Sequence, residues 1–278
     1  MSSINSKKIS EFRRTVWKYY NENGRHDLPW RKTKDPYRIL VSEVMLQQTQ
    51  VARVLEKYKQ FLKRFPTVRA LAKASLADVL KIWSGLGYNR RAKYLHDTAK
   101  QLMLFSRGRV FIASDELQKL PGIGPYTAAA IRVFAFNEPG ILIETNIRAA
   151  YIHHFYPFRT RRVLNGLVSD KKILPLAQKA AEGQDPREWH WALMDYGAYL
   201  KRSGVRNNSR SAHYTKQSKF EGSLRQVRGE ILRELHKGPV NPMRSDLIGF
   251  GKEKVKKALV GLKRDGLIVK EKGKWRIA

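Results

Sequence analysis

The 278-residue sequence contains no cysteine. This absence excludes disulfides, zinc sites built on thiolates, a cysteine nucleophile and an iron–sulfur cluster held by thiolate ligands. We therefore expect a protein with no metal site and no cofactor.

Long apolar runs are missing as well. Residues Met1 to Lys8 lack the apolar core of a signal sequence, and no run approaches the roughly 18 apolar residues of a membrane span. Hydrophobic residues still make up 42% of the chain, which is enough for a folded core. We expect a cytoplasmic monomer without a membrane partner.

Acidic residues are scarce. The chain has 24 Asp and Glu against 55 Lys and Arg, a net charge of +31. A protein this basic usually binds a polyanion, because each neutralised phosphate releases counterions and strengthens association. The alternatives are a solvated basic surface or an organism whose proteins are all basic. The charge favours nucleic acid as the partner.

Helical periodicity dominates the first 200 residues. Within 37–65, Val51, Leu55, Tyr58 and Leu62 recur at steps of four, three and four, which places them on one helix face. Short connections with Gly and Pro separate the expected helices. Residues 1–200 are therefore predicted to form an all-α domain. Its other helices are expected at 8–22, 75–84, 90–106, 114–119, 126–137, 146–156, 171–182 and 187–200.

The composition changes at Lys201. Residues 201–222 are polar and basic, which is typical of a linker or a surface strap. Residues 223–278 then resume apolar periodicity, with helices expected at 224–237 and 252–265 and a small hairpin after them. This order predicts a small α+β, winged-helix-like DNA-binding domain, and the alternative is a structural tail without DNA contact.

The segment from Leu120 to Ile131 combines a Gly-Ile-Gly turn with an Ala-rich helix. Because glycine has no side chain, the backbone at Gly122 and Gly124 can approach a phosphate, and the start of the next helix adds its positive end. Ile123 is expected to fill the gap between the two helices. The alternative is an ordinary helix–helix turn. Tyr126 and Thr127, in the first turn of the helix expected at 126–137, are also predicted to contact DNA at this site.

This segment resembles the helix-hairpin-helix of the HhH-GPD DNA glycosylase superfamily, and the chain is most similar to its MutY-type adenine glycosylases. The resemblance covers approximately residues 8–200 and is densest at 37–51, 83–96 and 120–148. It implies a two-lobed, all-α glycosylase fold and an enzyme of base excision repair. The implied partner is double-stranded DNA with a mispair or an oxidised base.

The stretch from Ser42 to Val51 is similar to the adenine-glycosylase signature, and the family's catalytic acid corresponds to Glu43. On general grounds this residue could also be a surface residue at a helix edge. Adenine leaves poorly as an anion, so an acid must protonate a ring nitrogen before the glycosidic bond breaks. A carboxyl group in partly apolar surroundings can keep its proton near neutral pH.

The resemblance implies a second catalytic carboxylate at Glu144, which stabilises the sugar oxocarbenium ion. The family usually has Asp at this position, and the extra methylene moves the charge by about 1.5 Å. Asn146 matches a family Asn that supports the site.

Three further matches concern DNA binding. Gln47 and Gln48 correspond to family residues that contact, and insert beside, the base opposite the excised one. Tyr88 corresponds to an aromatic residue that enters the base stack. Such an inserted side chain offsets the cost of flipping a nucleotide. The alternative for Tyr88 is core packing, and for the two glutamines it is simple solvent exposure.

The sequence departs from the family at three further places. Tyr126 occupies the position of the lysine with which lyase members form a Schiff base, which indicates hydrolysis without lyase activity. Thymine-removing members share this tyrosine, whereas adenine members usually have Ser. Lys201, Asn208 and Ser211 stand near the first three cysteines of the family's [4Fe–4S] cluster, so no cluster is expected. The 223–278 unit stands in place of a Nudix-like domain.

Three functions remain open from the sequence. The first is a monofunctional glycosylase that removes adenine mispaired with 8-oxoguanine or guanine, and the second is a thymine or uracil glycosylase acting opposite guanine. The third is a DNA-binding protein without catalysis. For residues 223–278 we expect lysine and arginine contacts to phosphates rather than base reading.

Overall fold

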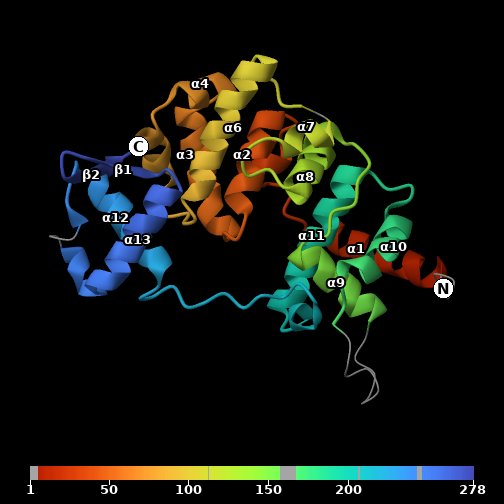
Figure 1. The fold of residues 1–278 in the computed structure, drawn as a ribbon. Coiled ribbons are helices and arrows are strands. Elements are labelled where there is room, and N and C mark those ends of the chain that lie inside the picture. Colours follow the sequence, from red (N-terminus) through yellow and green to blue (C-terminus); the bar gives the residue numbers. More distant parts are fainter. Residues whose placement is uncertain (1–5, 112, 157–166, 206, 243–245) are drawn as a thin grey trace. The chain divides into compact units, whose positions relative to one another are not determined.

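The computed structural model describes residues 6–111, 113–156, 167–205, 207–242 and 246–278. Helices dominate this part of the chain, and its two strands form one hairpin near the C-terminus (Figure 1). The chain divides into two compact units, each built from two separate stretches of sequence: 1–34 with 125–216, and 35–124 with 217–278. Among the described helices, none has the length and apolar character needed to cross a membrane.

The first unit is built from helices of both of its sequence stretches, 1–34 and 125–216. Their large aromatic side chains form its core, in which Phe12, Tyr151 and Trp189 are almost fully buried. The ring centroids of Phe12 and Tyr151 lie 4.9 Å apart. The elements of this unit are α1 (Ser6–Asn23), η1 (Pro29–Arg31), α8 (Pro125–Phe136), α9 (Thr145–Phe155), α10 (Asp170–Ala181), α11 (Pro186–Arg202) and η3 (Asn207–Arg210).

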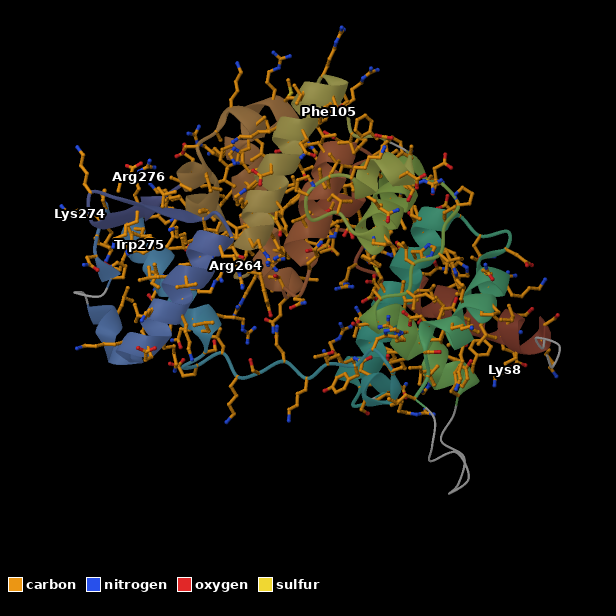
Figure 2. The ribbon with its side chains drawn as sticks, in the orientation of Figure 1. Lys8, Phe105, Arg264, Lys274, Trp275 and Arg276 are labelled. Carbon is orange, nitrogen blue, oxygen red and sulfur yellow. The ribbon has the colours of Figure 1, made fainter. Side chains whose placement is uncertain are left out.

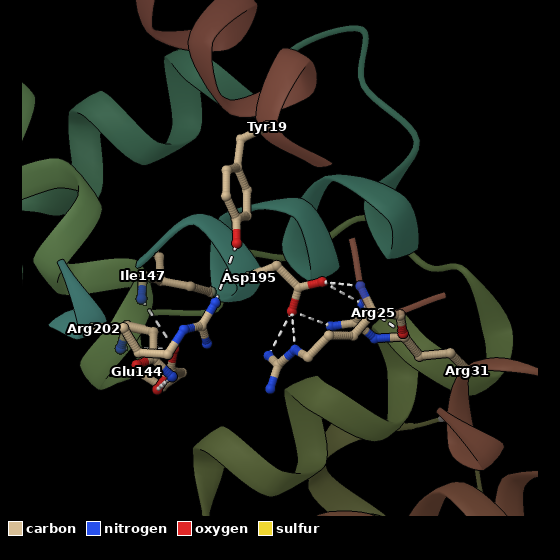
Figure 3. A network of polar contacts seen from close by, with 8 residues as sticks. Tyr19, Arg25, Arg31, Glu144, Ile147, Asp195 and Arg202 are labelled. Atoms are coloured by element: carbon tan, nitrogen blue, oxygen red, sulfur yellow. Dashed lines mark hydrogen bonds and ion pairs between the residues drawn. The ribbon is translucent and has the colours of Figure 1, made fainter. Parts of the chain in front are cut away.

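A buried ion cluster fixes the loop after α1 to helix α11. Asp195 of α11 is 2% exposed and accepts hydrogen bonds from Arg25 and Arg31 (Figure 3). The distance from Arg31 Nη1 to Asp195 Oδ2 is 2.7 Å, and the backbone N–H of Arg25 donates to the same oxygen at 2.8 Å. Because the Arg31 side chain is also nearly buried, the carboxylate compensates its charge.

The second unit begins with six helices and ends with the C-terminal elements. Helix α6 runs through its first stretch, and its buried face contains Leu95, Ala99 and Leu102. The elements are α2 (Pro36–Leu46), α3 (Val51–Arg64), α4 (Val68–Lys73), α5 (Leu76–Trp83), α6 (Arg90–Ser106), α7 (Ser114–Gln118), α12 (Leu224–Leu235), η5 (Asp246–Phe250), α13 (Lys252–Arg264), β1 (Ile268–Glu271) and β2 (Lys274–Ile277).

The C-terminal elements form the predicted pair of helices followed by a hairpin. Val227 and Ile231 of α12 and Val255 and Leu262 of α13 are fully buried, as the apolar periodicity predicted. Strands β1 and β2 are antiparallel, with Ile268 paired to Ile277. The side chains of Lys274, Trp275 and Arg276 are labelled on this hairpin in Figure 2.

Several boundaries differ from the sequence expectation. The helical stretch predicted for 37–65 is two helices, α2 and α3, separated at 47–50, where Gln48 has φ 54°. Helix α4 was not predicted, because its six residues span too few turns to show periodicity. The predicted all-α stretch 1–200 contributes to both units, and 217–278 belongs with 35–124.

Part of the predicted 201–222 linker is paired to the first unit. The backbone N–H of Val168 donates to the Arg210 carbonyl at 2.8 Å, and the N–H of Ala212 donates to the Val168 carbonyl at 3.0 Å. These two bonds make a parallel bridge between Val168 and Ser211. Residues 207–212 are therefore an ordered strap rather than a free tether.

Candidate functional site

Helix α2 positions Glu43. The helix begins at Pro36, where proline is well tolerated, and the Asp35 carboxylate caps it by accepting from the N–H of Tyr37 at 2.9 Å. Glu43 is half-buried between Ser42 and Val44, which are both buried. The predicted catalytic acid thus lies between two buried residues of a largely apolar helix.

Arg91 holds the end of α2 and was not identified from the sequence. Its Nη1 donates to the carbonyls of Val44, Met45 and Gln47 at 2.8, 3.0 and 2.6 Å. These are carbonyls that the end of a helix leaves without partners. Burial lowers the pKa of Arg91 to about 10. The guanidinium therefore fixes the turn that carries both glutamines.

The same guanidinium fixes the loop that carries Tyr88. Nη2 of Arg91 donates to the Thr49 hydroxyl at 2.9 Å and to the carbonyls of Leu86 and Gly87 at 3.3 and 3.2 Å. Tyr88 has φ 48°, a conformation that is uncommon for a residue with a side chain, and its ring is partly exposed. One buried cation thus links the 47–50 turn to the Tyr88 loop.

Four of the predicted DNA-contacting residues of this unit line one cleft. The cleft has a volume of about 930 Å³, and Gln47, Gln48, Tyr88 and Gly122 all contribute to its lining. Tyr88 is therefore not a core-packing residue, because the residue is 37% exposed. Further lining residues come from 217–236, a stretch for which the sequence had predicted no role in base reading.

The Gly-Ile-Gly turn has the geometry that its sequence predicts. Gly122 has φ 74°, and a Cβ atom there would lie 2.7 Å from Cδ2 of Tyr94. Ile123 is buried, and its N–H donates to the Leu120 carbonyl at 3.2 Å. A Cβ at Gly124 would meet nothing within 4 Å. The exposed backbone at Gly124 leads directly into α8, so the turn can approach a phosphate.

The first turn of α8 carries the two remaining predicted DNA contacts. Helix α8 begins at Pro125, Tyr126 is half-buried and Thr127 is buried. Thr127 is 4% exposed, so its side chain has little surface to offer DNA, and a contact there would involve the backbone.

Glu144 and Asn146 lie together at the start of α9 in the other unit. Glu144 is the N-cap residue, and its Oε1 accepts from the N–H of Asn146 at 2.8 Å and of Ile147 at 2.9 Å (Figure 3). Its Oε2 accepts from the Asn146 side-chain amide at 3.3 Å. Burial raises the pKa of the Glu144 carboxyl above its usual value, and these hydrogen bonds together with Arg148 oppose that rise.

Close backbone packing supports this cap. Gly197 of α11 lies against the Asn146 backbone so tightly that a Cβ atom would come within 1.9 Å of the Asn146 carbonyl oxygen. Only glycine allows the two helices to approach so closely. The Gly197 contact thus fixes the position of the Glu144 and Asn146 pair.

Comparisons with known proteins show which family this chain resembles. The family model for HhH-GPD superfamily base excision DNA repair proteins matches residues 41–161. The adenine DNA glycosylase of Buchnera aphidicola subsp. Baizongia pistaciae is 37% identical over 193 residues, which cover 68% of this chain and 52% of that protein. The human adenine DNA glycosylase is 34% identical over 203 residues, which cover 68% and 36%. The chain belongs to the HhH-GPD superfamily.

Solved structures of the superfamily share the fold, and the predicted all-α, two-lobed class is confirmed. A thermostable thymine-DNA glycosylase matches with a TM-score of 0.59 at 27% identity, over 69% of this chain and 87% of that one. An endonuclease III in a non-covalent DNA complex matches with a TM-score of 0.54 at 16% identity, over 91% and 98%. The chain spans about half or less of the length of the curated relatives named above.

The superfamily's [4Fe–4S] cluster does not fit the residues after α11. Lys201 is exposed, whereas Ser211 is buried and its side chain accepts from the His213 N–H at 3.0 Å. The neighbouring Asn207 is buried and donates to the Ala149 carbonyl at 3.3 Å. The strap is thus held by hydrogen bonds, and a chain without cysteine offers no thiolates to iron.

Proposed function

We propose that the protein is a monofunctional adenine DNA glycosylase. It hydrolyses the N-glycosidic bond of adenine mispaired with guanine or 8-oxoguanine in duplex DNA. The observation that carries the proposal is the similarity to adenine DNA glycosylases over 68% of this chain, together with Glu43 on a capped and buried helix. We further propose that it acts as a monomer in the cytoplasm, with duplex DNA as its partner.

The proposed chemistry divides between two carboxyl groups. Glu43 donates a proton to a ring nitrogen of adenine, so that the base leaves as a neutral molecule. Glu144 stabilises the positive charge that develops on the sugar. A water molecule then bonds to C1′ of the sugar and gives a proton back to Glu43, which completes the hydrolysis. Burial makes the ionised carboxylate of Glu144 costly. A positive charge on the sugar beside it offsets that cost, so the carboxylate stabilises the cationic transition state more than the neutral ground state.

Release of thymine or uracil opposite guanine is a second candidate. It is favoured by Tyr126 and by the similarity in structure to a thermostable thymine-DNA glycosylase. A panel of duplexes with A, T or U opposite G, C and 8-oxoguanine separates the candidates. The proposal expects base release, scored by strand scission in alkali, from A opposite G and 8-oxoguanine. Release from T or U alone would favour the second candidate, and release from no duplex would favour a DNA-binding protein without catalysis.

We predict that the protein breaks no DNA strand by itself. Tyr126 stands in place of the lysine that attacks the sugar in lyase members, and its phenol cannot form a Schiff base. Product strands should therefore appear on a denaturing gel only after alkali or heat. A covalent protein–DNA adduct trapped by borohydride would contradict this prediction.

We also propose that catalysis needs no iron. The strap at 207–212 is held by backbone bonds to Val168 and by the Asn207 amide. The purified protein should be colourless, and base release should be unchanged after prolonged dialysis against a chelator. Stoichiometric iron in elemental analysis, or loss of activity on chelation, would overturn this proposal.

A further inference from the structure

Arg225 in the first turn of α12 and Gln217 before that helix both contact Tyr88 directly. Nη1 of Arg225 donates to the Tyr88 hydroxyl at 2.9 Å, and the guanidinium lies 5.5 Å from the Tyr88 ring centroid. The Gln217 side-chain amide also donates to the Tyr88 hydroxyl, and it lies 3.5 Å from the Gln48 amide oxygen. Four side chains with planar groups thus converge at one point of the cleft, Gln48 and Tyr88 from one stretch of the unit and Gln217 and Arg225 from the other.

The surroundings of this point suit a nucleotide. Tyr88 and Phe220 are 37% and 59% exposed, and both line the cleft. Exposed aromatic rings and arginine planes are the surfaces on which bases stack. Asp265 is the single carboxylate among the described lining residues, and Arg228 and Arg90 pair with it. The unpaired charge in the cleft is therefore positive, as a DNA strand requires.

The cleft also lies close to the proposed acid along the chain. Gln47 and Gln48 follow α2 directly, about one helical turn beyond Glu43. Arg91 ties the end of α2 to both the glutamine turn and the Tyr88 loop. A base held at Gln48 is thus close to the adenine that Glu43 protonates, so we assign it as the partner in the mispair.

Arg225 has free donors for such a base. Within the described residues its hydrogen bonds use one N–H of Nη1 for Tyr88 and one of Nη2 for the Ser218 carbonyl at 2.8 Å. A guanidinium carries five N–H groups in a flat fork. That fork matches the adjacent O6 and N7 acceptors of guanine, a pattern that cytosine does not present.

We infer that Arg225 is a specificity-determining residue that reads the guanine opposite the excised adenine, with Gln217 and Tyr88 holding its guanidinium in place. This inference rests on the proposed adenine glycosylase function. It assigns base reading to the first turn of α12, within the 223–278 unit for which the sequence had predicted phosphate contacts alone.

The test compares single-turnover adenine release from duplexes with A opposite guanine, 7-deazaguanine or cytosine, at saturating protein. 7-Deazaguanine lacks the N7 acceptor but pairs like guanine. The wild-type protein should act about tenfold faster on the guanine duplex than on the 7-deazaguanine duplex, because loss of N7 breaks the bidentate contact and leaves only the bond to O6. In Arg225→Ala the two rates should be equal within about twofold. A wild-type ratio near one, or an unchanged ratio in Arg225→Ala, would overturn the inference.

Two further variants separate reading from charge and folding. Arg225→Lys keeps the charge and a donor for Tyr88 but loses the fork, so its ratio should also fall towards one. Arg264→Ala removes an exposed cation of α13 that lines the same cleft (Figure 2). This variant should keep the ratio of the guanine rate to the 7-deazaguanine rate. It should weaken binding to all duplexes and lower the slope of the logarithm of the DNA association constant against the logarithm of the salt concentration by about 0.9.

The outcomes also separate the two claims. A wild-type protein that releases adenine from no duplex contradicts the proposed function and the inference with it. The inference alone is contradicted if the wild-type protein releases adenine but Arg225→Ala and Arg225→Lys leave the ratio of the guanine rate to the 7-deazaguanine rate unchanged.

Discussion

Glu43→Gln is expected to reduce adenine release to background while duplex binding stays within a few-fold of the wild-type value. The amide has nearly the same shape as the carboxyl group, so the half-buried position on α2 remains filled. It cannot donate a proton to the leaving base at neutral pH, and general acid catalysis contributes about 10²–10⁴-fold in rate. Single-turnover assays and a fluorescence binding titration measure the two quantities.

Glu56→Gln provides a matched control for this variant. Glu56 lies on α3 in the same unit and accepts a hydrogen bond from Gln60 at 2.8 Å. Its substitution makes the same change in charge and should leave the rate within about twofold. Adenine release by Glu43→Gln at more than a tenth of the wild-type rate would remove Glu43 from the catalytic role.

Asp195→Asn is expected to destabilise the first unit by about 3–5 kcal/mol, because it leaves the buried Arg31 guanidinium without a counter-charge. Gly197, which supports the Glu144 cap, follows two residues later on the same helix. Urea unfolding followed by circular dichroism measures the change in the free energy of unfolding. Asp27→Asn is the control, since Asp27 is exposed in the same loop, and it should change stability by less than about 0.5 kcal/mol.

The same ion cluster predicts a pH dependence. Burial alone would raise the pKa of Asp195, but the hydrogen bonds and charges of Arg31 and Arg25 hold it below its usual value. A lowered folded-state pKa adds stability above the unfolded-state value of about 3.9, and that stability is lost as the pH falls through the folded-state value. The wild type should therefore lose stability in acid more steeply than Asp195→Asn. Equal unfolding free energies of the two proteins at pH 7 would contradict this account of the cluster.

The local features of the fold were largely predictable from the sequence. Helix α11 was expected at 187–200 and lies at Pro186–Arg202, and the C-terminal hairpin was expected where β1 and β2 lie. Gly122 lies in the predicted turn before α8 and has φ 74°, a conformation that glycine adopts readily. In each case periodicity or backbone freedom within a few residues determines the structure.

The remaining features depend on contacts between residues far apart in the sequence. The Arg91 side chain donates to the Gln47 carbonyl. The one local indication of this role is the position of Arg91 in the sequence, because it begins the buried face of α6 that continues through Leu95 and Leu102. Arg225 meets Tyr88 across 137 positions, which no local pattern indicates. The break between α2 and α3 depends on the same Arg91 contacts and was missed for the same reason.

The most direct measurement of the central claim is the identity of the released base. A duplex with adenine opposite guanine and a duplex with thymine opposite guanine are each incubated with the wild-type protein, and the free bases are separated by chromatography. The account predicts free adenine from the first duplex, at a rate that depends on Glu43, and no thymine from the second. Free thymine from the second duplex without adenine from the first would contradict it.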